Sequence, residues 1–269
     1  MNIKEADEQF ILENLSFTNS AMCSLEASRS RPWGGLEPPL GGFLLTTETN
    51  AASDNWAFLP SRTVDRAQIQ EACSFFGDLP FVWPVFPGAD PSYRRTLEDE
   101  GFFLYEKLVA MRRQPQARSE NTDLTFTKIT TGEGAALWAD TAWQGFDFPP
   151  GAPVSFVNLM RGLCAKKDLL LMLAERNGLP VGTALVSFSA LSAGVYYFST
   201  LPAERKKGVG AATMEEIFRI ARGGAPFGRD YVSLQATPSG VSFYTSLGFE
   251  SLFGIPLYSR PLYTDLGRR

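Results

Sequence analysis

The chain has 269 residues, of which 44% are hydrophobic, 13% aromatic and 20% charged, a composition typical of a folded protein with a sizeable core. A formal net charge of −4 and a pI of about 5.1 argue against nucleic acid as the main ligand, because an acidic molecule repels a phosphate polymer. Histidine is absent, which excludes Ser-His-Asp hydrolysis, histidine-bound metals and any imidazole base.

The first residues and the cysteines bear on location and redox state. The segment MNIKEADEQF lacks the basic and apolar regions of a signal peptide, and the longest apolar run, 169–174, is too short to span a membrane. The cysteines, Cys23, Cys73 and Cys164, are odd in number and widely spaced, unlike a disulfide framework or a zinc site. We therefore expect a cytoplasmic protein with buried thiols, no bound metal and no membrane partner.

The length favours two domains, at roughly one domain per ~150 residues. In the first half, residues 78–102 predict a strand, a turn that contains proline, a short helix and a Gly-Phe pair. The polar segment RRQPQARSENTD, residues 112–123, is flanked by apolar sequence and has the composition of a linker. We expect one domain over 1–112, a linker over 113–123 and a second domain over 124–269.

The second half begins with a predicted strand over 124–129 and a helix over 132–146, in which Leu137, Trp138 and Trp143 are the candidate inward positions. The loop 147–153 separates this helix from another over 155–165. Two strands then follow within 168–190, joined at Asn177 and Gly178, the pair that best accepts the positive φ of a tight hairpin.

A third strand of this meander covers 194–200, and a helix begins near Gly208. Its apolar stripe is formed by Ala212, Ile217, Phe218 and Ala221. A strand over 231–237, a short helix that ends at Gly248 and an extended segment over 250–259 complete the chain. This order predicts an α/β fold with a mixed sheet.

The two halves share a weak repeat. A shift of 147 residues places Gly101 and Phe102 on Gly248 and Phe249, and Leu97 on Tyr244. Such a period is typical of a duplicated domain. No counterpart of the segment RKKGVG occurs in the first half, so a duplication would leave the first copy without that loop.

The segment ERKKGVGAA, residues 204–212, sets three basic side chains beside two glycines. It is not a dinucleotide fingerprint, because residues 201–206 lie between the strand and the glycines and Thr213 takes the place of the third glycine. The segment GGAPFGRD, residues 223–230, resembles a Walker loop but has Arg229 in place of the lysine, which favours a simple turn. The remaining interpretation is a helix start whose N–H groups hold a pyrophosphate, with Arg205 and Lys207 near its charge.

The motif Arg205-x-x-Gly208-x-Gly210, preceded by STLP and followed by FYTSLGF, resembles the acyl-CoA-binding core of the GNAT superfamily of N-acyltransferases. The resemblance covers roughly 124–260, and the repeat resembles tandem members with one degenerate copy. It implies that acetyl-CoA is the acyl donor. It also implies a set of CoA-binding residues: Ser199, Thr200, Leu201, Arg205, Lys206, Lys207, Gly208, Val209, Gly210, Ala211 and Ala212.

Two positions depart from the family pattern. Many members have an asparagine seven residues before the tyrosine, at the position of Thr237, so one pantetheine contact differs here. Many also have a glutamate in the strand GVYYFST, which this sequence lacks.

Acyl transfer requires a neutral amine, a polarised thioester and a proton for the thiolate. Without histidine, the base would be a carboxylate acting through water, and Glu175, Glu204 and Asp147 are candidates. The N–H groups near Thr200 and Leu201 are candidates for stabilising the oxyanion. The resemblance places Tyr244 at the position of the general acid.

We thus expect an N-acetyltransferase acting on a primary amine of a small-molecule or amino-acid-like acceptor, as a monomer or homodimer. A non-catalytic acyl-CoA sensor of the same fold stays open, favoured by the lack of an obvious base. Transfer from aminoacyl-tRNA, as in Fem-type members, fits the acidic pI less well. The glycines, the charge run and Tyr244 also have purely structural interpretations, and Trp138, Trp143, Phe146 and Phe148 are either core or acceptor-pocket residues.

Overall fold

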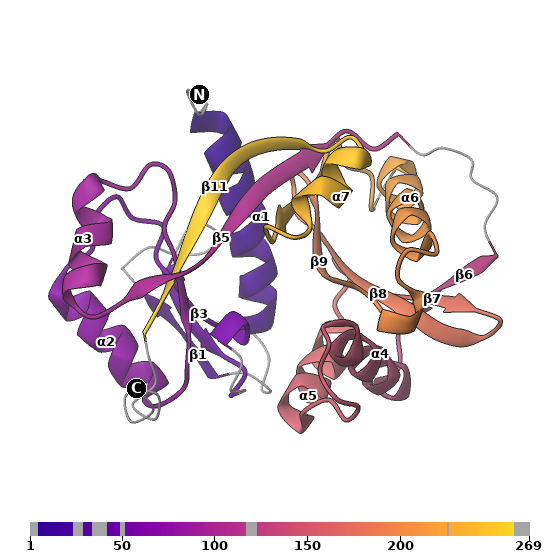
Figure 1. Ribbon diagram of the computed structural model, residues 1–269, viewed down its shortest axis with the longest axis horizontal. Coiled ribbons are helices and arrows are strands. Elements are labelled where there is room, and N and C mark those ends of the chain that lie inside the picture. The colour runs from indigo at the N-terminus through magenta and orange to yellow at the C-terminus, as the bar shows by residue number, and fades with distance from the viewer. Residues whose placement is uncertain are drawn as a thin grey trace. The chain divides into compact units, whose positions relative to one another are not determined.

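The computed structural model describes residues 5–23, 29–33, 42–48, 52–116, 123–224 and 226–260. It divides into two compact units. The first comprises Met1–Met111 together with Gln235–Arg269, and the second comprises Arg112–Leu234. Each unit is built around strands that helices cover (Figure 1).

The first unit contains strands in the order β1-β2-β3-β4-β11-β5. Strand β3 pairs with β4 in parallel, while β1 with β2, β2 with β3, and β4 with β11 pair antiparallel. Its elements are α1 (Glu5–Cys23), β1 (Arg29–Trp33), β2 (Gly42–Thr46), η1 (Ala52–Asp54), β3 (Asn55–Phe58), α2 (Arg66–Phe76), β4 (Val82–Pro84), α3 (Pro91–Asp99), β5 (Phe103–Arg113), α7 (Val241–Ser246) and β11 (Glu250–Ser259).

The core of the first unit is rich in aromatic side chains. Phe76 on α2 stacks on Phe81 with ring centroids 4.1 Å apart. The indole N–H of Trp83 donates to the hydroxyl of Tyr93 at 2.9 Å, which satisfies both polar groups inside the core. Burial raises the pKa of Tyr93, so its hydroxyl stays protonated.

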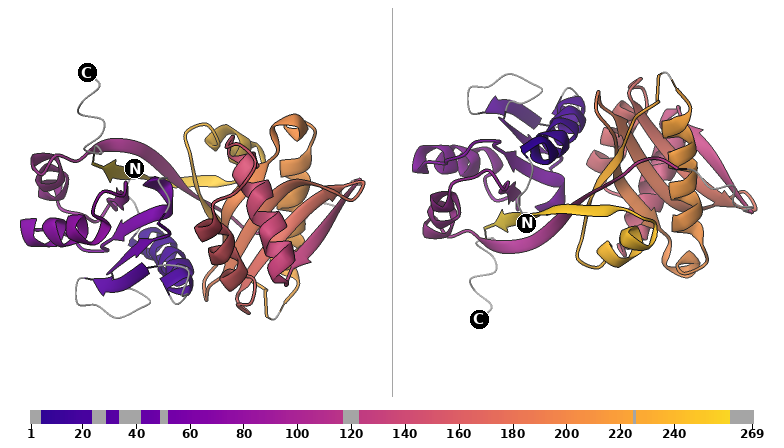
Figure 2. Two further views of the ribbon diagram at one scale, coloured as in Figure 1. Left: turned by 90° about the horizontal axis from the view of Figure 1, so that it is seen from below. Right: turned by 90° about the horizontal axis from the view of Figure 1, so that it is seen from above.

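The second unit contains strands in the order β10-β9-β8-β7-β6. The first four strands along the chain are antiparallel, and β9 pairs with β10 in parallel. Helices α4 and α5 cover one face of this sheet and α6 covers the other (Figure 2). The elements are β6 (Leu124–Ile129), α4 (Gly132–Gly145), α5 (Val154–Leu163), β7 (Leu169–Arg176), β8 (Leu179–Phe188), β9 (Ala193–Thr200), η2 (Pro202–Glu204), α6 (Val209–Arg222) and β10 (Val232–Ala236).

Most element predictions for the second half are confirmed. Asn177 and Gly178 have φ values of 53° and 75°, as expected for the tight hairpin between β7 and β8. The predicted stripe of α6 is buried. The prediction for Leu137 was wrong: its side chain is 48% exposed, because the buried face of α4 runs through Ala135, Trp138 and Ala142, and Leu137 lies outside that spacing. Trp143 is half-buried.

The repeat predicted from the sequence is visible in the backbone. The order β3-α2-β4-α3-β5 recurs as β9-α6-β10-α7-β11. Phe102 N–H donates to Leu97 O at 3.0 Å, and Phe249 N–H donates to Tyr244 O at 3.0 Å. Gly101 and Gly248 have φ values of 85° and 84°. The same turn therefore ends α3 and α7 in the register that the 147-residue shift predicts.

The compact units do not follow the expected domain boundaries of 1–112 and 124–269. The final segment, Gln235–Arg269, belongs to the first unit because β11 pairs antiparallel with β4, with Leu257 opposite Pro84 and Ser259 opposite Val82. In the expected linker 113–123, Arg113 is the last residue of β5 and Asp123 precedes β6, while 117–122 lie outside the described residues.

Two cysteines have described side chains. Cys73 and Cys164 are free and half-buried, not fully buried as expected, and burial raises the pKa of each thiol. The side chain of Cys23 lies outside the described part of the chain. Within the described residues, no group of histidine, cysteine and carboxylate side chains could hold a metal ion, and no helix is long and apolar enough to cross a bilayer.

Candidate functional site

The segment between β9 and α6 forms a tight turn in the second unit. Pro202–Glu204 make one turn of 3₁₀ helix, after which Lys206 and Gly208 adopt positive φ values of 63° and 81°. Two left-handed residues so close together reverse the chain and direct it into α6. Glycine accepts this conformation without the steric cost that a Cβ atom imposes.

The amino terminus of α6 has no side-chain cap. Gly208 occupies the N-cap position, and the first hydrogen bond of the helix runs from Ala212 N–H to Gly208 O at 3.0 Å. The N–H groups of Val209, Gly210 and Ala211 therefore have no partner within the helix, and they point out of its positive end. Ala212, which was expected to contribute its amide as well, instead uses it inside the helix.

The corresponding helix of the first unit, α2, is closed at the same place. Asp65 is its N-cap, and the carboxylate accepts from Gln68 N–H at 2.8 Å. The side chain of Gln68 in turn accepts from Asp65 N–H at 3.0 Å, which completes a capping box. A carboxylate thus occupies the start of α2, whereas the corresponding start of α6 has no side-chain cap.

Close packing fixes the start of α6 on the sheet. Val209 and Ala212 are buried in a cluster with Leu124, Ala174 and Val181. Gly182 on β8 lies underneath, and a Cβ atom there would be 2.8 Å from Ser199 O and 3.2 Å from Val209 Cγ1. A glycine inside a strand signals such a close approach, so this supporting position could have been found in the sequence.

The three basic residues of the turn differ in their contacts. Arg205 donates to Gly145 O at 2.9 Å, to Thr200 O at 3.2 Å and to a carboxylate oxygen of Asp147 at 3.0 Å. Lys207 pairs with Glu204 at 3.0 Å. Lys206 is exposed, and within the described residues it is the one of the three with no carboxylate partner. A ligand anion would meet Lys206 without first breaking an ion pair.

Arg176, at the end of β7, holds this turn in place. Its guanidinium contacts Glu204, pairs with Asp123 at 2.8 Å and donates to Lys207 O at 3.3 Å. The hydrogen bond from Lys207, together with the charges of Lys207 and Arg176, lowers the pKa of Glu204. Arg176 could not be identified from the sequence, because an arginine at a strand end carries no local signal of a partner 31 residues away.

Strand β9 carries a bulge just before the turn. Leu185 is opposite Tyr196 and Thr183 is opposite Ser199, so Ala184 alone faces Tyr197 and Phe198. Thr183 Oγ1 lies 2.8 Å from Ser199 Oγ and donates to Tyr197 O at 2.9 Å. β9 and β10 pair at their first residues, Ala193 with Val232 and Gly194 with Ser233.

The two candidate oxyanion donors are not equivalent. Leu201 N–H already donates to Val181 O at 2.9 Å, so it is not available to a ligand in this conformation. Thr200 remains the candidate of the pair.

All three candidate carboxylate bases have partners within the protein. Glu175 accepts from Thr127 Oγ1 at 2.5 Å, on the exposed face of the β6–β7 pair. Asp147 is paired with Arg205, and Glu204 is paired with Lys207 and Arg176. A lowered pKa makes Glu204 a weaker base.

Thr237 and Tyr244 belong to the other compact unit, so their position relative to the turn stays a prediction. Thr237 Oγ1 lies 3.1 Å from Ser239 Oγ. Tyr244 is half-buried between Phe243 and Phe249, with ring centroids 5.1 and 5.7 Å away. Burial raises the pKa of Tyr244, so the phenol remains protonated at neutral pH.

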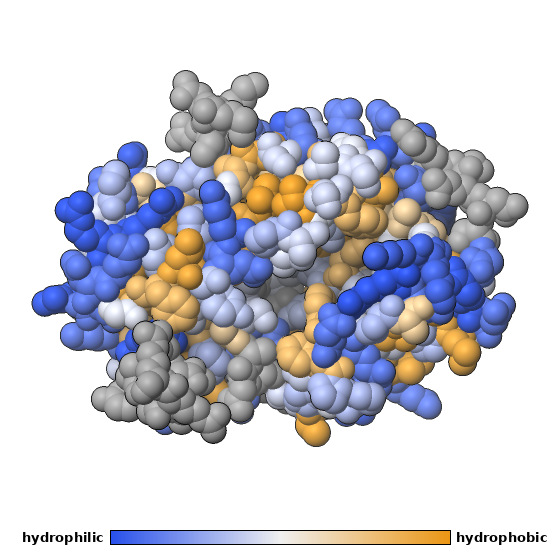
Figure 3. Space-filling view, viewed as in Figure 1, coloured by the Kyte–Doolittle hydropathy of each residue, from blue (hydrophilic) through white to orange (hydrophobic). Residues whose placement is uncertain are grey.

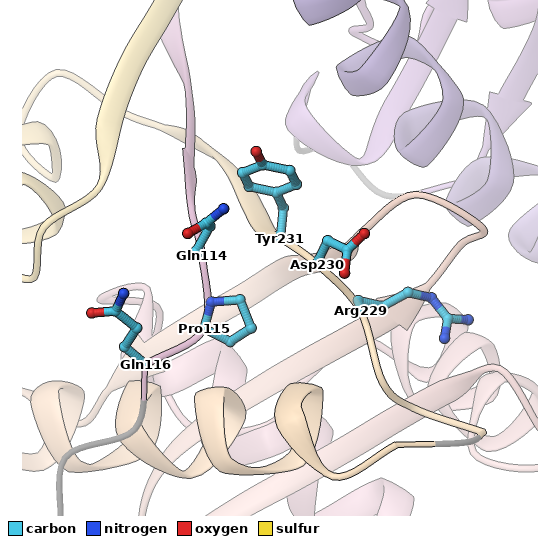
Figure 4. A pocket seen from close by; sticks show the side chains of 6 residues that line it. All are labelled: Gln114, Pro115, Gln116, Arg229, Asp230 and Tyr231. Atoms are coloured by element: carbon cyan, nitrogen blue, oxygen red, sulfur yellow. The ribbon is translucent and has the colours of Figure 1, made fainter.

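A separate surface hollow of about 420 Å³ is lined by Gln114, Pro115, Gln116, Arg229, Asp230 and Tyr231 (Figure 4). Figure 4 shows the side chain of Arg229 directed away from Gln114 and Tyr231. Its guanidinium donates to the carbonyl oxygens of Phe188, Pro226 and Gly228 at 3.1, 3.0 and 2.7 Å. Arg229 therefore closes a turn, as expected, and does not present its charge to a phosphate.

Residues 167–251 match the family model described as the acetyltransferase (GNAT) domain. The fold is similar to a GCN5-related N-acetyltransferase from Kribbella flavida, with a TM-score of 0.63 and 16% identity over 93% of this chain and 96% of that one. A tandem GNAT protein from the clavulanic acid biosynthesis pathway matches with a TM-score of 0.60 and 11% identity over 95% of both chains. A GCN5-related N-acetyltransferase from Sphaerobacter thermophilus matches with a TM-score of 0.59 and 16% identity, over 95% of this chain and 94% of that one. Among curated proteins, none matches this sequence.

Proposed function

Because residues 167–251 match the GNAT acetyltransferase domain and the chain folds as two GNAT-like domains in tandem, we propose that it is an N-acyltransferase that transfers an acetyl group from acetyl-CoA to a primary amine. The observation that carries the proposal is the open start of α6. Three N–H groups at Val209, Gly210 and Ala211 converge at the positive end of a helix. A diphosphate fits this chemistry, since it offers several acceptor oxygens and negative charge.

The residues of the turn and of the end of β9 then have separate roles. The amides of Val209, Gly210 and Ala211 bind the diphosphate, and Lys206 contributes a positive charge that no carboxylate among the described residues pairs with. The pantetheine arm lies along the end of β9, from Ser199 to Leu201. Arg205 acts on the protein itself, because its guanidinium already joins the α4–α5 loop to the end of β9.

The chain's own residues contribute two further steps to transfer. Thr200 N–H is the proposed donor to the thioester oxygen. Tyr244 is the proposed acid for the departing thiolate, and its protonated state at neutral pH is consistent with that role. The raised pKa also makes the phenol a weaker acid, so proton donation costs more than it would from an unperturbed tyrosine.

A non-catalytic acyl-CoA-binding protein is the second candidate function. It is favoured by one observation: Glu175, Asp147 and Glu204 are all held by other side chains. Incubation with acetyl-CoA and a panel of amines, with release of the CoA thiol as the readout, separates the two. Amine-dependent thiol release supports the enzyme. CoA binding without release supports the sensor, and the absence of CoA binding contradicts both.

A further inference from the structure

Six aromatic side chains of the second unit form one connected cluster, which we name the aromatic cluster. Trp143 stacks on Phe148 with ring centroids 4.2 Å apart, and it lies 6.0 Å from Phe156. Tyr197 lies 5.4 Å from Phe156, 6.2 Å from Trp138 and 6.5 Å from Phe146. Helices α4 and α5, the loop between them and strand β9 all contribute to it.

The bulge in β9 places Tyr197 in this cluster. Tyr197 has a φ of 45°, a left-handed conformation that is rare for an aromatic residue and that carries a steric cost. Its carbonyl is fixed by Thr183 Oγ1 at 2.9 Å, and its ring is held by the neighbouring rings. The surrounding contacts thus maintain a backbone that a regular strand would not adopt.

The aromatic cluster has a buried base and an exposed rim. Trp138 and Phe156 are buried, whereas Phe146 and Phe148 are 45% and 43% exposed. Leu137 on α4 and Val154 on α5 are also exposed apolar side chains. Figure 3 shows apolar side chains at the surface over these two helices. Exposed rings that continue a buried cluster indicate a surface for binding an apolar group.

The rim lies directly beside the end of β9. Gly145, the last residue of α4, contacts Ser199 so closely that a Cβ atom on Gly145 would be 2.2 Å from Ser199 Oγ. Arg205 also links the end of α4 to the end of β9, because it donates both to Gly145 O and to Thr200 O. On the proposed function, the thioester lies at this strand end, so an amine that rests on the aromatic cluster is next to the acyl carbon.

Asp140 and Asp147, the two carboxylates of the α4–α5 segment that lie nearest in sequence to the rim, are already engaged. Asp140 accepts from Gly151 N–H at 2.8 Å and from Ala152 N–H at 3.2 Å, and it also accepts from Gln144. Asp147 is paired with Arg205. A polycation such as spermidine needs several free carboxylates, whereas a single ammonium group can be held by ring faces.

We propose that the acceptor is a primary amine that carries an aromatic group, which stacks on the aromatic cluster. This inference rests on the proposed function. The amine nitrogen attacks the thioester carbon, a C–N bond forms and the C–S bond breaks. The ammonium first loses one proton to solvent, because only the neutral amine has a lone pair for the attack. The nitrogen loses its second proton as the amide forms, and this balances the proton that CoA gains when it leaves as the thiol. The product is the N-acetyl arylalkylamine.

The test compares 2-phenylethylamine, butylamine and spermidine as acceptors with acetyl-CoA. We expect kcat/KM for 2-phenylethylamine to exceed that for each of the other two by at least about 10-fold, as expected from stacking and apolar burial. Phe148→Ala and Phe146→Ala should each reduce this preference by about 3-fold to 10-fold and leave CoA affinity unchanged. Leu179→Ala removes a side chain that is 68% exposed on the β7–β8 hairpin and should change neither quantity.

Amine binding in the presence of CoA, measured by saturation-transfer NMR, gives a second readout that does not require turnover. The aromatic acceptor is supported if 2-phenylethylamine binds preferentially and its binding weakens in Phe148→Ala. If this binding is seen without any acetyl transfer, only the proposed catalysis fails. Equal binding of butylamine and 2-phenylethylamine, or a preference for spermidine, overturns the aromatic acceptor. If the parent protein does not bind CoA, the proposed function itself is contradicted.

Discussion

The guanidinium of Arg205 lies 3.0 Å from the carboxylate of Asp147, so the turn that precedes α6 is tied to the loop between α4 and α5. Both side chains are substantially exposed, and an exposed ion pair contributes at most about 1 kcal/mol to stability. Its effect should therefore be on the position of the loop.

Asp147→Asn should raise the KM for the amine acceptor by about 3-fold to 10-fold, because a freed loop holds the acceptor less firmly. The free energy of unfolding should fall by less than about 1 kcal/mol. Steady-state kinetics and chemical denaturation measure the two quantities. A change in CoA affinity larger than the change in acceptor KM would show that the pair serves the donor.

Gly208→Ala should weaken CoA binding strongly. A side chain at a φ of 81° costs about 1–2 kcal/mol, and relief of that strain would displace the N–H groups of Val209 and Gly210. Gly101→Ala is a matched control, since Gly101 has a φ of 85° in the first unit and, as at Gly208, a Cβ atom added there would meet no neighbouring atom within 4 Å. Thermal unfolding should show similar destabilisation in both variants, and calorimetric titration should show lost CoA affinity only in Gly208→Ala.

Lys206→Ala should weaken CoA binding by about 5-fold, which corresponds to one exposed charge contact of about 1 kcal/mol. Lys207→Ala should have a smaller effect, because Lys207 already pairs with Glu204. The difference between the two variants should shrink as salt is raised from about 50 to about 500 mM, since screening weakens the contact. Equal losses would mean that Lys207 leaves Glu204 to bind the ligand.

Tyr244→Phe should lower kcat by about 100-fold, the smaller end of the range for general acids, and leave CoA affinity nearly unchanged. Burial raises the pKa of Tyr244 above its ordinary value of 10.0. The phenol is therefore protonated through the neutral range, and ionisation of Tyr244 removes activity only as the pH rises through that raised value. The measurement is a pH–rate profile of the parent protein and of Tyr244→Phe. If the parent loses activity near pH ~8 and Tyr244→Phe loses it at the same pH, another group is responsible for that loss.

Local sequence patterns predicted those features that depend on neighbouring residues. The Asn177-Gly178 hairpin, the stripe of α6 and the start of α6 near Gly208 follow from turn chemistry and helical spacing. The repeat was detectable because Gly101 and Gly248 end equivalent helices in one register.

Features that depend on distant contacts were not predictable in the same way. The pairing of β11 with β4 joins segments from opposite ends of the chain, and strand periodicity does not encode the identity of a partner. The engagement of Arg205 with Asp147, and of Leu201 N–H with Val181 O, likewise appears only once the chain is folded. These contacts explain why Arg205 and Leu201 are less available to a ligand than the motif alone suggests.

Hydrogen exchange with and without acetyl-CoA tests the central claim most directly, since it reports on the amides that are proposed to hold the diphosphate. The account predicts slower exchange at Val209, Gly210 and Ala211, and unchanged exchange at the start of α2, where Asp65 caps the helix. Unchanged exchange at Val209–Ala211 with saturating acetyl-CoA, or protection confined to the first unit, would contradict it.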